Sequence, residues 1–133
     1  MTNTRRSKLH RTMRTKLKLS KLGFKSEKWI GHYRVDEVNY DYRIIIEING
    51  DAVHGNPSVY NSTDVLPYGI TASEKWEQDA KRKKFLEEHN WFVIVIWESD
   101  DLKIKRKLLK TIIETRKLLL ETNKHGKDSQ VTN

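Results

Sequence analysis

Apolar and polar positions near the start of the chain follow the period of a helix. Leu9, Met13 and Leu17 recur every four residues, and Gly23 is a typical stop signal soon after them. The pattern predicts a basic amphipathic helix within residues 1–25, with its apolar face against the rest of the protein.

Two strands are predicted next, joined by a turn. Residues 33–38 alternate between apolar and polar side chains, as in a half-buried strand, whereas residues 43–48 are mostly apolar, as in a strand buried on both faces. Asn-Tyr-Asp-Tyr at residues 39–42 favours a turn. We therefore expect a hairpin that brings Asp36 close to Glu47.

The second half of the chain predicts a helix followed by a third strand. Residues 71–74, Thr-Ala-Ser-Glu, have the form of a capping box, and the helix is expected to end near His89, with Asn90 in the left-handed closing position. Residues 91–97 are apolar on both faces, which predicts a central strand. A helix between two buried strands favours a crossover with parallel pairing.

These elements predict an α/β fold with a small mixed sheet, made of the hairpin plus a parallel strand after the crossover helix, and flanked by helices. A chain of 133 residues fits one domain. Its expected parts are a basic N-terminal helix (1–25), a core with the candidate chemistry (26–100), a basic C-terminal helix (101–122) and a flexible tail (123–133). Residues 50–69 are expected to form a functional or mobile loop.

Charge adds a candidate partner to this picture. The formal net charge is +8, and the first 25 residues contain no acidic side chain. Two basic arms around a more acidic centre suit a polyanion, although such helices can also be merely solvated. The side chains expected to contact nucleic acid are Arg5, Arg6, Lys8, Arg11, Arg14, Asn56, Tyr60 and Arg82.

Composition excludes several other classes. The chain has no cysteine, so disulfides and thiolate zinc sites are excluded. No apolar run approaches the roughly 18 residues that span a membrane, and the start of the chain lacks the apolar core of a signal peptide. We therefore expect a cytoplasmic protein that does not enter the membrane.

Candidate chemistry gathers at the ends of the apolar elements. Asp36 and Glu47 can supply oxygen ligands for Mg²⁺, and the carbonyl of Ile48 can add another. His54 can deprotonate water near neutral pH, and Asp79 can orient it and stabilise its protonated form. Such a set has what phosphodiester hydrolysis needs.

Each of these residues has an ordinary structural alternative. Asp36 could bond a loop amide, Glu47 could pair with Arg43 or Lys75, and His54 could be a simple loop histidine. The remaining candidates are interpreted as local structure: Asp51 as a turn residue, Glu98 as a helix cap, and His10, His32, His89 and His125 as residues of the surface or the basic arms.

The spacing of these residues resembles one family of nucleases. The segments are Glu47-Ile-Asn-Gly-Asp-x-x-His54, then Trp76-Glu-x-Asp79-x-x-Arg82-x-x-x-Leu86, then Asn90-Trp-x-Val-x-Val-Ile-Trp-Glu98. Together they resemble the very-short-patch-repair endonucleases, and particularly the phage-encoded, free-standing homing endonucleases of the EDxHD type, within the PD-(D/E)XK nuclease superfamily.

The resemblance implies a PD-(D/E)XK nuclease-like fold and a Mg²⁺-dependent endonuclease, with Mn²⁺ as a substitute. The implied reaction is hydrolysis of phosphodiester bonds in double-stranded DNA, as nicks or double-strand cuts, by a monomer or a DNA-induced dimer. Asp36 matches the metal-binding aspartate, His54 the histidine that activates water, and Asp79 the aspartate that supports it. Glu47 falls at the second acidic position, and Asn49 stands where many members have lysine.

The sequence differs from the family pattern in three ways. Thr12 stands near the place of the first-helix glutamate, with Glu27 as a candidate substitute. Ala52 and Val53 replace the aromatic residues with which the repair enzymes wedge open a mismatch, and the cysteines of a structural zinc site are missing. The last two favour the homing branch over mismatch repair. A repair-type nickase, a binding module without catalysis, and a nuclease for RNA or branched DNA remain open.

Overall fold

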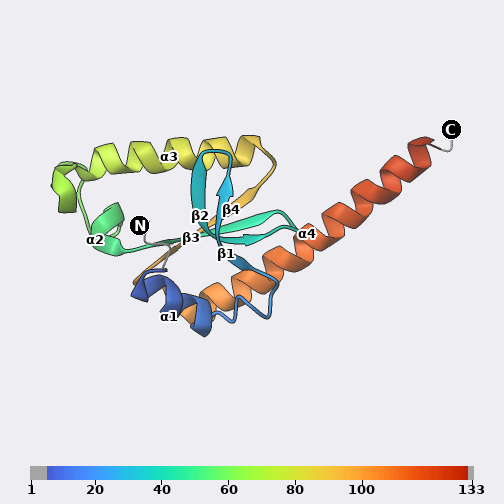
Figure 1. Ribbon diagram of the computed structural model, residues 1–133, viewed down its shortest axis with the longest axis horizontal. Helices are drawn as coiled ribbons and strands as arrows, with labels where there is room; N and C mark the ends of the chain where they lie inside the picture. Colours follow the sequence, from blue (N-terminus) through green and yellow to red (C-terminus); the bar gives the residue numbers. More distant parts are fainter. Residues whose placement is uncertain (1–5, 132–133) are drawn as a thin grey trace. The chain divides into compact units, whose positions relative to one another are not determined.

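The computed structural model describes residues 6–131, with side chains as far as Asn123 (Figure 1). The chain divides into two compact units, the first ending at Asp100 and the second beginning at Asp101. In chain order the elements are α1 (Lys8–Lys16), β1 (Lys25–Ile30), β2 (Tyr33–Asn39), β3 (Ile44–Asn49), α2 (Asp51–His54), the 3-10 turn η1 (Pro67–Gly69), α3 (Ala72–Glu88), β4 (Phe92–Trp97) and α4 (Leu102–Val131).

The first unit contains a four-stranded mixed sheet in the order β1-β2-β3-β4. Strands β1 and β2 pair antiparallel, as do β2 and β3, whereas β3 and β4 pair parallel. Helix α3 makes the crossover between the two parallel strands. The predicted hairpin, crossover helix and parallel strand are therefore confirmed, as is an α/β fold with helices flanking a mixed sheet.

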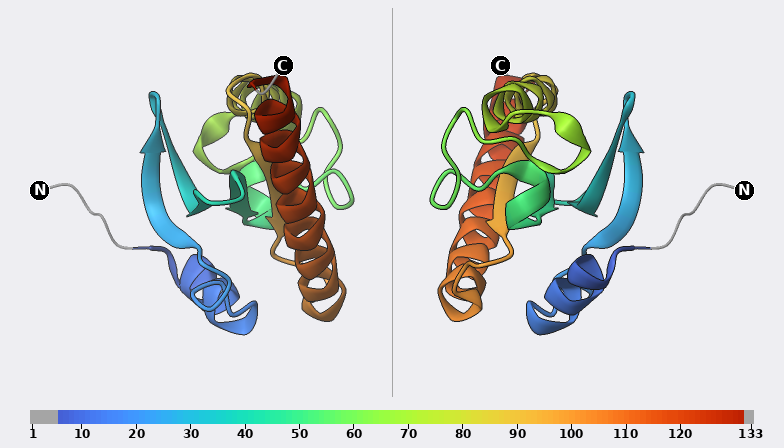
Figure 2. Two further views of the ribbon diagram at one scale, coloured as in Figure 1. Left: turned by 90° about the vertical axis from the view of Figure 1, so that its right-hand side faces the viewer. Right: turned by 90° about the vertical axis from the view of Figure 1, so that its left-hand side faces the viewer.

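The two faces of this sheet are covered by different helices. Figures 1 and 2 show α3 on one side of the strands and α1 on the other. Val38 pairs with Ile45 in the β2–β3 ladder, and both belong to a core cluster with Leu86 of α3 and Trp91. Successive strand residues point to opposite faces. Neighbouring residues in β2 and β3 therefore face α3 and α1 in turn.

Strand β3 is the most buried element of the sheet. All six of its residues are buried, and four of them are isoleucines. Their β-branched side chains fit a strand packed on both faces, and each fully buried isoleucine contributes about 1.5–3 kcal/mol relative to exposure. The strand is thus a rigid support for whatever its polar residues do.

Strand β4 lies at the edge of the sheet, although its two apolar faces predicted a central position. Phe92 at its start is 42% exposed. Apolar faces indicate shielding from water above and below a strand, which does not require a strand neighbour on each side. The predicted central position is therefore wrong.

Strand β1 is absent from the sequence-based prediction, and α1 is shorter than predicted. Helix α1 ends at Lys16, and turns occupy residues 17–23. The β1 sequence is largely polar, and Glu27 has a positive φ of 55° that interrupts the ladder between Ser26 and Lys28. The register is the same on both sides of Glu27, but the sequence of β1 does not alternate between apolar and polar residues, so the pattern carries no signal for the strand.

Helix α3 begins and ends as predicted. The Thr71 hydroxyl accepts from the Glu74 amide at 3.2 Å, as expected for the N-cap, and donates to the Glu74 carboxylate at 2.9 Å. Asn90 has the expected left-handed backbone, with φ 67°. The Arg43 guanidinium donates to the carbonyls of His89 and Asn90, so it satisfies backbone groups beyond the end of the helix.

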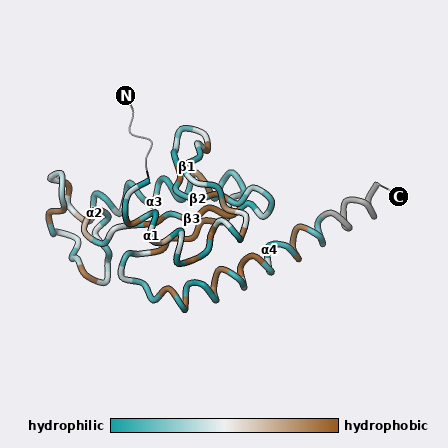
Figure 3. The backbone as a smooth tube through the Cα atoms, turned by 60° about the horizontal axis from the view of Figure 1, so that its bottom comes forward, coloured by the Kyte–Doolittle hydropathy of each residue, from teal (hydrophilic) through white to brown (hydrophobic). Residues whose placement is uncertain are grey.

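The second unit consists of α4, which begins after Asp101. The Asp101 carboxylate accepts from the amides of Lys103 and Ile104, so it caps the helix. Apolar and polar segments alternate along α4 in Figure 3, as in an amphipathic helix. The helix continues past residue 122 to Val131, and the last two residues of the predicted tail lie outside the described part. No helix in residues 6–131 is long and apolar enough to cross a membrane.

Candidate active site

A cleft of about 690 Å³ opens against the sheet face that α3 covers. Side chains from β2, β3, α2, α3 and β4 line it. The structure brings into this cleft all five residues predicted to carry catalysis or hold a metal: Asp36, Glu47, Ile48, His54 and Asp79.

Two carboxylates meet across the β2–β3 hairpin. The Asp36 carboxylate accepts from the Ile48 amide at 2.7 Å, and the Asp36 amide donates to the Glu47 carboxylate at 3.4 Å. The neighbouring pair, Glu37 and Ile46, lies directly opposite in the ladder. Strand alternation therefore sends Asp36 and Glu47 together to the α3 face.

Glu47 is held as a buried ion pair. It is 8% exposed, and its carboxylate accepts from Nε of Arg82 at 2.7 Å. The pKa of Glu47 is raised from 4.5 to about 7. Burial is the main cause and the negative charge of Asp36 adds to it, while Arg82 offsets only part of the rise. The alternative pairing of Glu47 with Arg43 or Lys75 is not what the structure shows.

This pair of carboxylates has the chemistry that Mg²⁺ requires. Hard oxygen ligands suit the ion, and a buried carboxylate beside a second one is relieved by added positive charge. Asp36 and Glu47 would hold it, together with the carbonyl of Ile48. In the described part of the chain, no three His, Cys, Asp or Glu side chains converge on a metal position, so water would complete the ligand set.

Glu27, the candidate substitute for the first-helix glutamate, does not lie with Asp36 and Glu47. Glu27 forms an ion pair with Arg34, with 2.5 Å between the carboxylate and the guanidinium, and it does not line the cleft. Thr12 is exposed on α1. Neither residue supplies to the cleft the carboxylate that the resemblance leads us to expect from the first helix.

His54 and Asp79 form the second pair in the cleft. Nδ1 of His54 lies 2.9 Å from the Asp79 carboxylate, and Nζ of Lys75 lies 3.5 Å from the other oxygen of Asp79. When Nδ1–H donates to Asp79, Nε2 keeps its lone pair and can accept a proton. The side chains of His54 and Asp79 are 25% and 28% exposed, so solvent reaches them.

The segment carrying His54 is fixed more firmly than a long loop would be. Helix α2 ends at Gly55, whose φ of 64° is a left-handed closing conformation, and the Trp76 indole donates to the Gly55 carbonyl at 2.6 Å. Leu66 packs so closely that a Cβ on Gly55 would lie 2.8 Å from it. Val65 and Thr71 form an isolated β-bridge. The segment predicted to be a functional or mobile loop is therefore tied to α3 through Trp76.

Three side chains expected to contact DNA instead make bonds within the protein. Asn56 is buried, and its amide donates to Asp51 and Ser99. The guanidinium of Arg14 pairs with buried Glu37. Arg82 pairs with Glu47, as described. Buried carboxylates and loop groups need these donors, so none of the three side chains is free. Whether they also contact DNA stays a prediction.

The other expected DNA contacts remain near the surface. Lys8 and Arg11 are exposed on α1, and Tyr60 is half-buried. Arg6 donates to the Ser26 hydroxyl at 2.8 Å. Arg5 lies outside the described residues.

Two further assignments change with the structure. His10, expected at the surface, is buried, with Nε2 2.6 Å from the carboxylate of Glu37. Glu98 accepts from the Asp51 amide at 3.1 Å and so caps α2, whereas Asp101 caps the last helix. Asp51 itself is local structure, as expected.

Sequence reasoning did not assign Lys75 to the cleft. A signal was available, because Lys75 precedes Asp79 by one helical turn, the spacing at which two side chains meet on one helix face.

A scan against protein-family models finds none that matches this chain, and a search of curated proteins finds no significant match. The case for a function therefore depends on the cleft and its two residue pairs.

Proposed function

We propose that this chain is a metal-dependent endonuclease that hydrolyses phosphodiester bonds in double-stranded DNA. The observation that carries the proposal is the presence of two pairs in one cleft: His54 with Asp79, and Asp36 with Glu47. The first pair is suited to moving a proton and the second to holding a divalent cation. Their spacing in the sequence supports a PD-(D/E)XK-type enzyme similar to free-standing homing endonucleases.

In this mechanism His54 accepts the proton of the attacking water at Nε2. Asp79 orients the ring through Nδ1 and stabilises the imidazolium that forms. General-base catalysis of this kind contributes typically about 10²–10⁴-fold in rate. Lys75, beside Asp79, adds positive charge to the side of the cleft where a phosphate would enter.

The carboxylates act on the other side of the cleft. Asp36 and Glu47, with the Ile48 carbonyl, would hold Mg²⁺, or Mn²⁺ in its place; the bound ion would offset charge that develops on the phosphate. The Ile48 amide fixes Asp36, and Arg82 fixes Glu47. Arg82 is itself oriented by the Arg34 carbonyl and lies over the Tyr33 ring, with Cζ 5.3 Å from its centroid.

Nucleic acid is the substrate that the charge favours. The formal net charge is +8, and Lys8 and Arg11 are exposed on a helix without acidic residues in its first turn. Such groups attract phosphates without reading sequence.

Plasmid cleavage tests this proposal. We expect the wild-type protein to nick supercoiled plasmid in Mg²⁺ or Mn²⁺. In EDTA, or with Ca²⁺ alone, we expect no cleavage. His54→Ala and Asp36→Ala should each lower the rate by roughly 10²-fold or more. His89→Ala, which changes an exposed histidine outside the cleft, is the matched control. A His54→Ala protein that cleaves at the wild-type rate would overturn the assignment.

One observation favours a second candidate, a nucleic-acid-binding module without catalysis. Arg82 already forms an ion pair with Glu47, as in a purely structural contact. This alternative predicts DNA binding that Mg²⁺ does not change, and no nicking with any metal.

A further inference from the structure

A second, smaller pocket of about 440 Å³ lies between Arg6, helix α1, the turns after it and strand β1. Its lining includes four cationic side chains, Arg6, Arg14, Lys25 and Lys28, together with the hydroxyl of Ser26. None of these residues lines the larger cleft.

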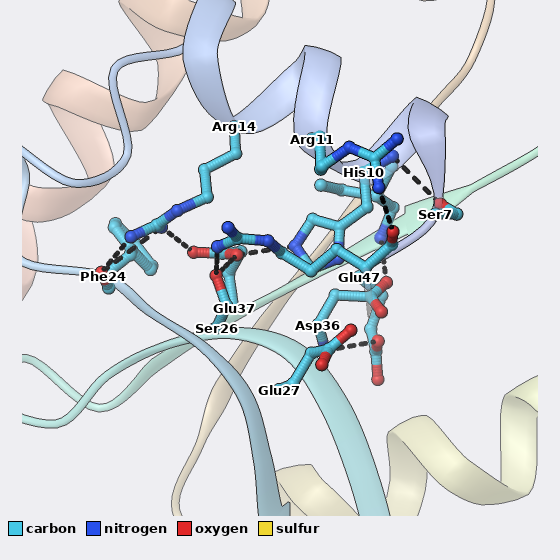
Figure 4. Close-up of polar contacts among 12 residues, drawn as sticks. Ser7, His10, Arg11, Arg14, Phe24, Ser26, Glu27, Asp36, Glu37 and Glu47 are labelled. Carbon is cyan, nitrogen blue, oxygen red and sulfur yellow. Dashed lines mark hydrogen bonds and ion pairs between the residues drawn. The ribbon is translucent and has the colours of Figure 1, made fainter. Parts of the chain in front are cut away.

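One buried carboxylate organises the floor of this pocket. Glu37 is 0% exposed and contacts three side chains: His10 at 2.6 Å, Arg14 and Ser26. Figure 4 shows Arg14 and His10 reaching down from α1 to Glu37, with Ser26 beside it. These contacts fix the guanidinium of Arg14 and the hydroxyl of Ser26 before any ligand arrives.

The same chain of contacts reaches Arg6. The Ser26 hydroxyl donates to Glu37 and accepts from Nη1 of Arg6 at 2.8 Å. The Arg14 guanidinium also donates to the Phe24 carbonyl from both of its terminal nitrogens. Two arginines are therefore held in place at one wall, which lowers the entropy lost when they bind an anion.

Positive charge in the pocket exceeds what Glu37 can neutralise. Four cationic groups face one carboxylate, and that carboxylate is inaccessible to solvent. Lys25 and Lys28 are exposed, and no carboxylate among the described side chains forms an ion pair with either. The pocket is thus a preformed site for an anion with several acceptor oxygens.

Strand register separates this site from the cleft. Ser26 pairs with Glu37 in the β1–β2 ladder, so its side chain points away from the face that carries Asp36. Lys28 lines this pocket and does not line the cleft. A ligand held here would leave the cleft free for the bond to be cut.

We propose that this pocket binds a backbone phosphate of nucleic acid, at a position separate from the cleavage cleft. The inference rests on the proposed function for its choice of nucleic acid as the source of phosphate. Arginine guanidinium groups match phosphate oxygens in geometry, and the exposed Lys25 and Lys28 add charge. Ser26 acts indirectly, because its hydroxyl donates to Glu37 and holds Arg6 in place. The contact anchors the duplex and carries no sequence information.

Salt-dependent DNA binding tests the pocket without requiring cleavage. The variant is Lys25→Gln/Lys28→Gln, in which both changed side chains are exposed, so folding should be preserved. Binding of a fluorescent duplex is measured by anisotropy in EDTA over a series of salt concentrations. We expect several-fold weaker binding, and a slope of log Kobs against log [salt] that is shallower by about 1.

Lys81→Gln/Lys84→Gln is the matched control. It removes the same charge from exposed positions on α3, outside both pockets. The salt slope of this control should stay within about half a unit of the wild-type slope, in keeping with the loss of no phosphate contact. Equal effects in the two double variants, or no effect in the Lys25/Lys28 variant, would overturn the proposal.

Inorganic phosphate distinguishes the two sources of the anion. Phosphate added at constant ionic strength should displace wild-type protein from the duplex more than it displaces the Lys25/Lys28 variant. Binding of free phosphate with unchanged duplex affinity in the variant would overturn a nucleic-acid role. Plasmid cleavage in Mg²⁺ is measured in parallel: cleavage without pocket-dependent binding refutes the pocket alone, and pocket-dependent binding without cleavage refutes the nuclease alone.

Discussion

Glu47 could bind a metal ion, but its ionisation in a buried position should lower the stability of the protein. Its pKa is raised to about 7 by burial and by Asp36, so the folded protein binds a proton more tightly there than the unfolded chain does. In the absence of a cation, the free energy of unfolding should therefore fall as pH rises from about 4.5 to about 7. The total loss expected from this group is about 3 kcal/mol.

Denaturant unfolding in EDTA between pH 5 and 8 measures this loss. Glu47→Gln should flatten the pH dependence, because the amide does not titrate. Glu77→Gln, at an exposed position on α3, is the control and should leave the curve unchanged. Identical curves for Glu47→Gln and wild type would show that burial does not control this carboxyl group.

Asp79 should determine which nitrogen of His54 carries the proton. Asp79→Asn keeps the size of the side chain but removes the charge that stabilises the imidazolium, so nicking should fall by roughly 10²–10⁴-fold. Single-turnover plasmid nicking in Mg²⁺ gives the rate, and duplex affinity in EDTA should change little. Asp41→Asn, in the exposed hairpin turn, provides a control of equal charge. A normal rate in Asp79→Asn would assign Asp79 a structural role only.

At the scale of elements, the position of α2 depends on Gly55. Gly55→Ala adds the strain of a left-handed residue, about 1 kcal/mol, and a methyl group 2.8 Å from Leu66. Because Gly55 follows His54 directly, we expect both a lower melting temperature and slower nicking.

Gly69→Ala separates the effect of backbone strain from the effect of the contact with Leu66. Gly69 has a similar positive φ of 79°, but no atom lies within 4 Å of the place that an alanine methyl group would take there. In this control the backbone strain should lower the free energy of unfolding by a comparable amount, and the nicking rate should not change. Equal nicking rates in the two variants would mean that the packing of Leu66 does not position His54.

Elements with strong local patterns were predictable from the sequence, and those without them were not. The hairpin, the N-cap at Thr71 and the closing Asn90 follow from periodicity and turn chemistry. Strand β1 is not predictable because its sequence is mostly polar and its two apolar residues, Trp29 and Ile30, are adjacent. The edge position of β4 depends on strand order, which no pattern within a strand records.

The candidate site divides in the same way. The approach of Asp36 to Glu47 follows from the hairpin. The contact of His54 with Asp79 is expected from side-chain chemistry and from the family resemblance, and no local rule of structure specifies it. The pairing of Arg82 with Glu47 joins side chains 35 residues apart, and no local pattern specifies it. Pairings between side chains so far apart in the sequence depend on packing that forms only in the complete fold.

At the scale of the whole molecule, each chain offers one cleft with both pairs among its described residues. One cleft can cut one strand at a time, so nicked circles should accumulate before linear plasmid appears. A time course on an agarose gel at several protein concentrations checks this order. Linear product that forms directly, with a rate that depends on the square of protein concentration, would instead indicate a dimer on DNA.

Strand β2 carries Asp36 and Glu37 side by side, one facing the cleft and the other facing α1. Insertion or deletion of one residue before them would exchange their faces, because side chains alternate along a strand. The buried partner of His10 and Arg14 would then enter the cleft, and the cleft would lose its aspartate. Length changes in homologous chains should therefore avoid β2 and occur in the turns that flank it.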